Sequence, residues 1–331
     1  MRIVIPMAGY GTRLRPHTWS KPKPLVSVAG KAVLGHVLDM FADLPDVEEV
    51  VFIVGYLGRQ VETYVAEHYP RLQARYLEQT EMLGQSHAVW LAREYLHGPI
   101  LTIYVDTLID TDFSSLQPDR PEAVAWVKAV PDPRRFGVAE VRPDGSVRRL
   151  VEKPEDASNN LVVVGGYFFP QGEALLSAIE KQMASGQRLQ GEFFLADAIN
   201  ILLDEGLKMR TAPVDVWLDC GNADSLLETN RHLLATGSDN SAQAATRQGV
   251  VIVPPVYVDP SAVVQESVIG PHVSIGAECE IVRSVIQDSI VDAGSQIQGA
   301  SLAGSLIGRE ARVIGRQQSL NVGDSSEIGF A

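Results

Sequence analysis

Residues 1–235 show two alternating hydrophobic patterns, one typical of strands and one of helices. Strand-like runs rich in β-branched residues fall at 2–6, 49–55, 99–106, 122–130, 136–142 and 162–169. Helix-like runs, with apolar residues three or four positions apart, fall at 31–42, 86–96 and 192–205. Because strands and helices alternate, we predict an α/β fold whose largely parallel sheet has helices on both faces. Residues 136–153 instead predict a hairpin around Asp144 and Gly145, so the sheet should be mixed.

After residue 249 the helical pattern gives way to a short repeat. An aliphatic residue recurs every five or six positions, at Val258, Val264, Ile269, Ile275, Ile281, Ile286, Val291, Ile297, Leu302 and Ile307. This period is typical of a parallel β-helix, in which each short strand points one aliphatic side chain into a stacked core. The polar stretch 235–249 between the two patterns predicts a linker. We therefore expect two domains, at 1–240 and 250–331.

Charge and cysteine content narrow the possible classes of protein. The 331 residues carry a formal net charge of −13, which argues against a nucleic-acid-binding surface. No apolar run is long enough for a membrane helix. Two cysteines, Cys220 and Cys279, are too few for a disulfide framework, so we expect a cytoplasmic protein. Residues 1–38 nevertheless carry six basic side chains and no acidic one, which suits a small anionic ligand.

The basic residues cluster in the stretch "MAGYGTRLRPHTWSKPKPL" at 7–25, directly after the first predicted strand. Gly9 and Gly11 allow the backbone to bend and to present N–H groups to an anion, and Arg13 matches phosphate oxygens. The prolines that follow do not fit the helix of a dinucleotide-binding fingerprint, and the P-loop pattern is absent. A glycine turn alone is weak evidence, so phosphate binding rests on the basic residues around it.

Each of Lys21 and Lys23 precedes a proline, which favours an extended backbone. We predict a stiff extended arm with both lysines on one side, able to carry an ammonium group to a phosphate. The alternative is a proline-rich surface linker with solvated lysines.

The run "AGYGTRLRPHTWSKPKPLVSVAGK" closely resembles the signature of the sugar-1-phosphate nucleotidylyltransferases. Further elements of that family follow in order, at "EQTEMLGQSHAV", "YVDT", "FGV", "VEKP", "VGGYFF", "GEFFLAD" and "WLDCGN". The repeat-bearing C-terminal region is similar to long-form glucose-1-phosphate thymidylyltransferase-like proteins. The resemblance implies a Rossmann-like three-layer nucleotidyltransferase domain with a mixed, mostly parallel sheet, followed by a short left-handed parallel β-helix.

The resemblance also assigns roles to individual residues. Catalytic roles fall to Arg13 and Lys23, with Lys23 at the α-phosphate. The implied nucleotide-binding residues are Gly9, Gly11, Thr12, Gln79 and Gly84. The implied sugar-phosphate residues are Gly137, Glu152 and Lys153. Asp106 and Asp219 would hold Mg²⁺, which prefers oxygen ligands. Taken without the resemblance, the aspartates could be turn or cap residues and Glu152–Lys153 an ordinary surface pair.

The implied reaction is in-line, Mg²⁺-assisted attack of a sugar 1-phosphate on a nucleoside triphosphate, giving a nucleotide sugar and pyrophosphate. Gln79 slightly favours dTTP or UTP, and the resemblance favours glucose 1-phosphate. The family commonly has glycine where this chain has Val105, and the glycine turn is one residue shorter than in many thymidylyltransferases, so base and sugar preference stay open. The alternatives are an enzyme specific for GTP and mannose 1-phosphate, a bifunctional acyltransferase, and a catalytically silent relative that binds nucleotide sugars. We further expect a homo-oligomer assembled through the β-helix.

Overall fold

The computed structural model describes residues 1–42, 44, 46–111, 113, 116, 122–316, 322 and 325. The chain forms two compact units. The N-terminal unit comprises Met1–Val26 and Lys31–Thr229, and the C-terminal unit comprises Ser27–Gly30 and the chain from Asn230 onward. Beyond Arg316, all of the predicted range 250–331 except Val322 and Ser325 lies outside the described residues.

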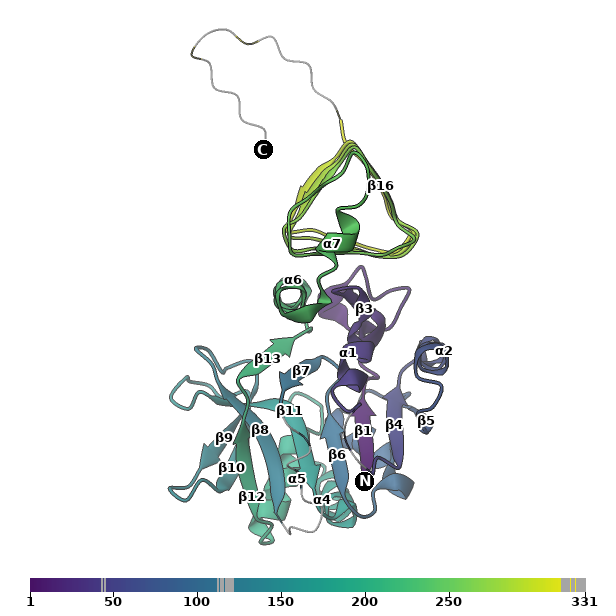
Figure 1. The fold of residues 1–331 in the computed structure, drawn as a ribbon. Coiled ribbons are helices and arrows are strands. Elements are labelled where there is room, and N and C mark those ends of the chain that lie inside the picture. The colour runs from purple at the N-terminus through teal and green to yellow at the C-terminus, as the bar shows by residue number, and fades with distance from the viewer. Residues whose placement is uncertain are drawn as a thin grey trace. The chain divides into compact units, whose positions relative to one another are not determined.

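A nine-stranded mixed sheet forms the centre of the N-terminal unit (Figure 1). Its strands are β1 (Arg2–Pro6), β4 (Glu49–Val54), β5 (Ala74–Glu78), β6 (Ile100–Ile103), β8 (Ala123–Ala129), β9 (Gly137–Val141), β10 (Val147–Glu152), β11 (Leu161–Phe169) and β12 (Met209–Pro213). They follow the order β10-β9-β11-β6-β1-β4-β5, with β8 beside β11 and β12 beside β8. Strand β1 runs parallel to β4 and β6, whereas β11 runs antiparallel to β6, β8 and β9. The mixed sheet and the hairpin between β9 and β10 confirm the prediction.

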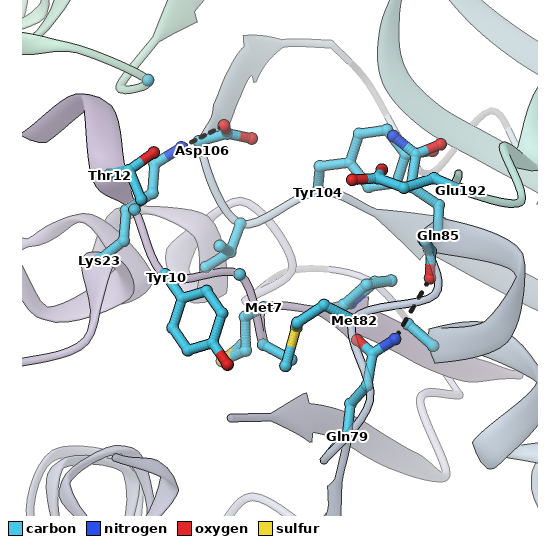
Figure 2. A pocket seen from close by; sticks show the side chains of 18 of the residues that line it. Met7, Tyr10, Thr12, Lys23, Gln79, Met82, Gln85, Tyr104, Asp106 and Glu192 are labelled. Carbon is cyan, nitrogen blue, oxygen red and sulfur yellow. Dashed lines mark hydrogen bonds and ion pairs between the residues drawn. The ribbon is translucent and has the colours of Figure 1, made fainter. Parts of the chain in front are cut away.

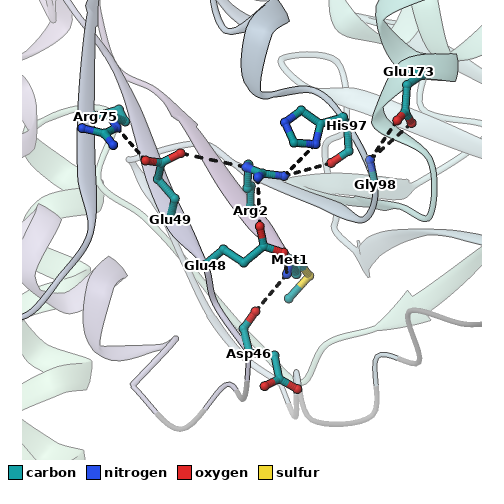
Figure 3. Close-up of polar contacts among 9 residues, drawn as sticks. All are labelled: Met1, Arg2, Asp46, Glu48, Glu49, Arg75, His97, Gly98 and Glu173. Carbon is teal, nitrogen blue, oxygen red and sulfur yellow. Dashed lines mark hydrogen bonds and ion pairs between the residues drawn. The ribbon is translucent and has the colours of Figure 1, made fainter.

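Hydrogen bonds and ion pairs fix the beginning of β1 between its two parallel neighbours (Figure 3). The terminal amine of Met1 donates to the Asp46 carbonyl at 2.9 Å and pairs with Glu48 at 3.1 Å. Arg2 pairs with Glu48 at 2.9 Å and donates to the His97 carbonyl at 3.2 Å. These contacts set the register of β1, and therefore the place where the glycine turn leaves the sheet.

Helices cover both faces of this sheet, as predicted. The N-terminal unit contains α1 (Val33–Asp39), α2 (Gly58–His68), α3 (Gln85–Leu91), α4 (Gly172–Ser185), α5 (Leu195–Asp204) and α6, which runs from Ala223 to Leu233 across the unit boundary. Val4, Ile53 and the buried residues of α3, α4 and α5 form one core cluster. Ile3 and Phe52 alternate with these residues and are fully buried on the opposite face. No helix among the described residues is long and apolar enough to span a bilayer.

Short elements complete the N-terminal unit. They are the 3₁₀ turns η1 (Thr12–Leu14), η2 (Lys23–Leu25) and η3 (Arg93–Tyr95), and the strands β3 (Lys31–Ala32), β7 (Thr107–Asp110) and β13 (Val216–Asp219). Strands β7 and β13 form a separate antiparallel pair in which Asp219 lies opposite Thr107. This pairing joins segments about a third of the chain apart, and it matters for the site described below.

The C-terminal unit contains three parallel four-stranded sheets arranged as a triangle (Figure 1). The first has β14 (Val251–Ile252), β17 (Val268–Ile269), β20 (Val285–Gln287) and β23 (Ser301–Ala303). The second has β15 (Val256–Val258), β18 (Val273–Ile275), β21 (Ile290–Val291) and β24 (Leu306–Ile307). The third has β16 (Val263–Gln265), β19 (Glu280–Val282), β22 (Gln296–Gln298) and β25 (Arg312–Ile314). The same unit includes β2 (Ser27–Val28).

The repeated aliphatic residues form the core of this unit. Ile269, Ile275, Ile281 and Ile286 are fully buried, and Leu302 and Ile307 pack against them. The stacked parallel strands are consistent with the predicted left-handed parallel β-helix.

The predicted linker at 235–249 is wrong. It contains the end of a π-helical segment (Leu234–Ser238) and helix α7 (Ser241–Ala244). Asn240 donates to the carbonyl of Val258 at 2.9 Å and accepts from its N–H at 2.8 Å. The polar side chains that suggested a solvated linker thus pair with the exposed backbone of the first coil.

Candidate active site

A cavity of about 500 Å³ opens at the carboxyl ends of β1, β5 and β6 (Figure 2). Eight of the residues assigned by resemblance line it: Gly9, Gly11, Thr12, Arg13, Lys23, Gln79, Gly84 and Asp106. Four others do not line it: Gly137, Glu152, Lys153 and Asp219. Ligands of open α/β sheets bind at this end of the strands, so the fold places the cavity where a substrate is expected.

The glycine turn forms one wall of the cavity. Gly11 has a left-handed φ of 60°, and an added Cβ would lie 3.0 Å from Lys23 Cβ and 3.1 Å from Thr18 Cγ2. Thr18 fixes the turn by donating to the Gly11 carbonyl at 2.8 Å. Gly9 differs, because a Cβ there would meet no atom within 4 Å. Gly11 is therefore required by the fold, whereas Gly9 leaves open space that a ligand can approach.

Lys23 lies next to the turn, but the predicted extended arm is wrong. Pro22 is extended, with φ −70° and ψ 150°, and the chain then enters the 3₁₀ turn η2. Lys21 is buried, at 3% exposure, and is not among the cavity-lining residues, whereas Lys23 lines the cavity. The Val26 N–H closes this turn by bonding to the Lys23 carbonyl at 3.0 Å, so Lys23 does not adopt the extended backbone that a residue before proline prefers.

Lys23 forms an ion pair and hydrogen bond with Oδ2 of Asp106, which follows β6 (Figure 2). Burial alone would raise the pKa of Asp106, but the charge and hydrogen bond of Lys23 bring it below its usual value. Asp106 is therefore an anion at neutral pH, with Oδ1 turned away from the lysine contact.

The strand pair β7–β13 brings Asp219 beside Asp106. Asp219 lies opposite Thr107, and the N–H of Cys220 donates to the Asp106 carbonyl at 2.9 Å. Burial, and next the negative charge of Asp106, raise the pKa of Asp219. The positive charge of Arg13 lowers the pKa of both carboxyl groups. The two aspartates thus form a mutually repelling pair, and Asp106 is the member of the pair that lines the cavity.

This pair fits a hard divalent cation. Two close carboxylates repel each other, and a bound cation would remove that repulsion. Within the described part of the chain no cluster of three His, Cys, Asp or Glu side chains could hold a metal. An ion at Asp106 and Asp219 would therefore take its other ligands from substrate oxygens or water, as Mg²⁺ commonly does.

The residues assigned to the sugar phosphate gather around the end of the β9–β10 hairpin. A Cβ on Gly137 would lie 3.0 Å from Oε2 of Glu152. The pKa of Glu152 is raised to about 6, mainly by burial. The negative charge of nearby Glu192 also raises this pKa. Lys153 donates to Oε1 of Gln190 at 3.1 Å and lies 4.8 Å from the Phe194 ring centroid.

Tyr104 and Glu192 connect the two groups of residues. Both line the cavity (Figure 2). Burial is the main cause that raises the pKa of Tyr104, and the charges of Glu152 and Asp106 contribute, so the ring lies near both carboxylates. The Tyr104 hydroxyl donates to Oε1 of Gln85 at 2.8 Å. The cavity therefore extends past Asp106 to Tyr104 and Glu192, and both of these residues interact electrostatically with Glu152.

Gln79 and Gly84 lie together at another wall. Nε2 of Gln79 donates to the Gly84 carbonyl at 3.3 Å and lies 3.1 Å from Nδ1 of His87. Gly84 has φ +105°, and a Cβ there would come within 2.6 Å of the Phe193 backbone. Packing against Phe193 therefore requires glycine at position 84, independently of any ligand.

The structure adds residues that sequence reasoning did not assign. Tyr104, Gln85, Glu192 and Gly221 line the cavity. A Cβ on Gly221 would lie 2.7 Å from Oδ1 of Asp219 and 3.1 Å from Nη2 of Arg13. All four lie in motifs that were recognised as family elements, and nothing in those letters showed which residues face the cavity.

Comparisons with known proteins agree with this geometry. A family model described as nucleotidyl transferase matches residues 3–236. The glucose-1-phosphate thymidylyltransferase of Streptomyces antibioticus is 32% identical over 362 residues, covering 99% of this chain and 99% of that protein. The bifunctional protein GlmU of Methanocaldococcus jannaschii is 33% identical over 267 residues, covering 80% of this chain and 61% of that protein.

Solved structures agree on the fold. A UDP-glucose pyrophosphorylase complexed with UDP-glucose has a TM-score of 0.61 and 21% identity, covering 74% of this chain and 99% of that chain. Because the family model spans residues 3–236 and the thymidylyltransferase aligns over nearly the whole length, this chain belongs to the nucleotidyl transferase family.

Proposed function

We propose that the protein transfers a nucleotidyl group from a nucleoside triphosphate to a sugar 1-phosphate, giving a nucleotide sugar and pyrophosphate. The observation that carries this proposal is the cavity lined by Arg13, Lys23 and Asp106, with Asp219 held next to Asp106 by the β7–β13 pair. Fixed cations next to a carboxylate pair suit a reaction that joins two anionic substrates.

In this reaction a phosphate oxygen of the sugar 1-phosphate attacks the α-phosphorus in line. The bond from the α-phosphorus to the bridging oxygen breaks, and pyrophosphate leaves with the electron pair. Lys23 stabilises charge at the α-phosphate, while Arg13, Thr12 and the glycine turn hold the triphosphate. The attacking oxygen is already ionised, so no general base is required. Asp106 and Asp219 would hold Mg²⁺, which neutralises phosphate charge when bound.

The rest of the site supports a choice of substrates. Gly137, Glu152 and Lys153 bind the sugar 1-phosphate, with Glu152 accepting hydrogen bonds from sugar hydroxyls. Gln79 and Gly84 face the base. Since Nε2 of Gln79 is engaged within the protein, Oε1 is the atom that accepts from N3–H of thymine or uracil.

We favour glucose 1-phosphate with dTTP or UTP. The Streptomyces relative is named a glucose-1-phosphate thymidylyltransferase, and a second relative, from Haloferax volcanii, is named a UTP–glucose-1-phosphate uridylyltransferase. The latter is 30% identical over 240 residues, covering 70% of this chain and 96% of that protein.

A pyrophosphate-release screen tests the proposal. The purified protein is incubated with Mg²⁺ and every pairing of dTTP, UTP, ATP, CTP and GTP with glucose 1-phosphate, mannose 1-phosphate and other sugar 1-phosphates. We expect release with glucose 1-phosphate and dTTP or UTP, and release by K23A at a rate about 10²-fold or more lower. Release only with GTP and mannose 1-phosphate would replace the substrate assignment. No release with any pair would support a silent nucleotide-sugar-binding relative instead.

We propose that residues 1–240 form the catalytic domain. Residues 250–331 form the β-helix, through which copies of the chain would assemble. Val251, Val268 and Val285 lie in register on successive coils, and Val251 and Val285 are 57% and 46% exposed. Such a ladder supports homo-oligomerisation through this sheet. The V251D/V285D double variant should be smaller than the wild type in analytical ultracentrifugation, and an unchanged mass would reject this surface.

The free cysteines Cys220 and Cys279 support a cytoplasmic location.

A further inference from the structure

A second cavity of about 660 Å³ lies in the N-terminal unit and shares no lining residue with the active-site cavity. Four arginines line it, together with two aspartates: Arg142, Arg148, Arg149, Arg188, Asp197 and Asp204. We call it the arginine cleft. It is formed by the β9–β10 hairpin, the end of α4, the loop after α4, and α5. Its charge is net positive although the chain carries −13, so the arginines are concentrated there against the overall trend.

A β-bulge explains how two consecutive arginines reach the same cleft. In a regular strand Arg148 and Arg149 would point to opposite faces. The register between β9 and β10 shifts between Val147 and Arg149, so the pleat is interrupted at Arg148. Both arginines are exposed, and the buried residues Val147 and Leu150 flank them. The bulge therefore turns both side chains to the cleft while the strand keeps its hydrophobic contacts.

Two of the four guanidinium groups are held in place and two have free donors. Arg142 donates to the Val147 carbonyl at 2.8 Å, and the Arg188 guanidinium lies 4.5 Å from the Phe193 ring centroid. Within the described residues, the guanidinium groups of Arg148 and Arg149 form no hydrogen bond or ion pair. Arg149 does interact electrostatically with Asp197. Burial raises the pKa of Asp197, and the positive charge of Arg149 lowers it. The cleft thus offers unused planar donors next to positioned ones, the arrangement that suits phosphate oxygens.

A buried amide in the lining is also incompletely bonded. Gln182 is 3% exposed and donates through Nε2 to the Phe194 carbonyl at 2.8 Å. Its Oε1 is buried and has no hydrogen-bond partner among the described residues. A buried acceptor left unpaired is costly, and a hydroxyl donor or a water in the cleft would satisfy it.

We propose that the arginine cleft is a second binding site, for a small molecule that carries phosphate groups and hydroxyls. The free donors of Arg148 and Arg149 would bind the phosphate, and Gln182 and its polar neighbours would meet the hydroxyls. The proposal does not depend on which reaction the active-site cavity catalyses.

Two segments connect the cleft with the sugar-phosphate residues. Strand β10 carries Arg148 and Arg149 near its beginning and ends at Glu152. The loop after α4 places Arg188 in the cleft, while Gln190 accepts a hydrogen bond from Lys153 and Glu192 lines the active-site cavity. A ligand that orders these arginines would therefore also restrain the residues around Glu152 and Lys153.

Isothermal titration calorimetry with inorganic pyrophosphate, without metal, tests the proposal on the full chain. The variants are R148Q/R149Q and the charge-matched control R59Q/R71Q, whose exposed arginines lie near the opposite edge of the sheet. We expect the wild type and the control to share a site that R148Q/R149Q loses or binds at least tenfold more weakly. K23A should retain that site, which separates it from the active-site cavity. Circular dichroism confirms that each variant is folded, and R148Q alone gives a milder change if the double variant is not.

The outcomes are distinct. Loss of one pyrophosphate site in R148Q/R149Q alone supports the proposal, whether or not the active-site cavity also binds pyrophosphate. Equal affinity and stoichiometry in R148Q/R149Q and R59Q/R71Q would overturn it. A parallel titration with succinate checks the ligand class, because binding as tight as that of pyrophosphate would make the cleft a general anion site.

Discussion

Replacing Glu152 with glutamine should stabilise the N-terminal unit at neutral and alkaline pH while weakening the proposed sugar binding. Burial, as the main cause, raises the pKa of Glu152 from 4.5 to about 6. Because the folded-state pKa lies above the unfolded one, the stability that Glu152 contributes is present below pH 4.5 and is lost as the pH rises through 6. The full change corresponds to about 2 kcal/mol. The glutamine of E152Q cannot ionise, so the variant does not lose this stability as the pH rises.

The measurement is urea unfolding followed by tryptophan fluorescence, at pH 8 and pH 5. All four tryptophans lie between residues 19 and 217, so the signal reports the N-terminal unit alone. The gain in unfolding free energy of E152Q over the wild type should be about 2 kcal/mol at pH 8 and about 0.8 kcal/mol at pH 5. E155Q, at an exposed position of the same segment, should show no such gain.

The comparison between the two pH values makes this prediction sharp. Other titrating groups are present in both proteins, so their effects cancel in the difference. A gain for E152Q that is equal at pH 5 and pH 8 would refute the reasoning, since a buried carboxylate must show its cost only where it ionises. The same variant should raise the KM for the sugar 1-phosphate, because an acceptor of hydroxyl hydrogen bonds becomes a weaker one.

Three further predictions concern the turn, the aspartate pair and strand β11. K23A should lower kcat by about 10²-fold or more, because no other fixed cation replaces the ammonium at the α-phosphate; near-wild-type kcat in the pyrophosphate assay would remove Lys23 from the mechanism. D219N should raise the Mg²⁺ concentration for half-maximal activity, and an unchanged Mg²⁺ titration would exclude Asp219 as a ligand. G165A should lower the unfolding free energy by about 1–3 kcal/mol, since Gly165 has φ +87° and its Cβ would lie 2.6 Å from Tyr104 Cδ2. Gly98, with φ +68° and no atom near its Cβ, is the matched control, and equal losses in G98A and G165A by urea unfolding would argue against the clash.

Local sequence patterns were sufficient for much of the fold. The β-branched runs that predicted strands contain β1, β4, β6, β8 and β9 and all of β11 except its first residue, because burial on both faces of a sheet requires continuous apolar sequence. The hairpin at Gly145, which has φ +82°, followed from turn chemistry alone. The β-helix followed from its period, since every coil repeats the same contact with the coil before it.

Local preference failed where a distant segment supplied the stronger interaction. Residues before proline favour an extended backbone, yet Lys23 begins a 3₁₀ turn that places it against Gly11 and Asp106. The polar segment 235–249 looked like a linker, but Asn240 bonds both backbone groups of Val258. In each case a hydrogen bond or ion pair to residues far along the chain, or in another element, outweighed a preference of a few tenths of a kcal/mol to about 1 kcal/mol.

The sequence by itself determined the strands, the repeat and the kinds of side chain that the chemistry requires, because these depend on neighbours close in the chain. Only the tertiary structure decided which of those side chains meet. The β7–β13 pairing brought Asp219 to Asp106. Packing against Phe193 explained Gly84, and a single bulge turned Arg148 and Arg149 into one cleft. Such meetings depend on strand register and on backbone approach between distant segments, and a one-residue change in register moves every side chain to the other face.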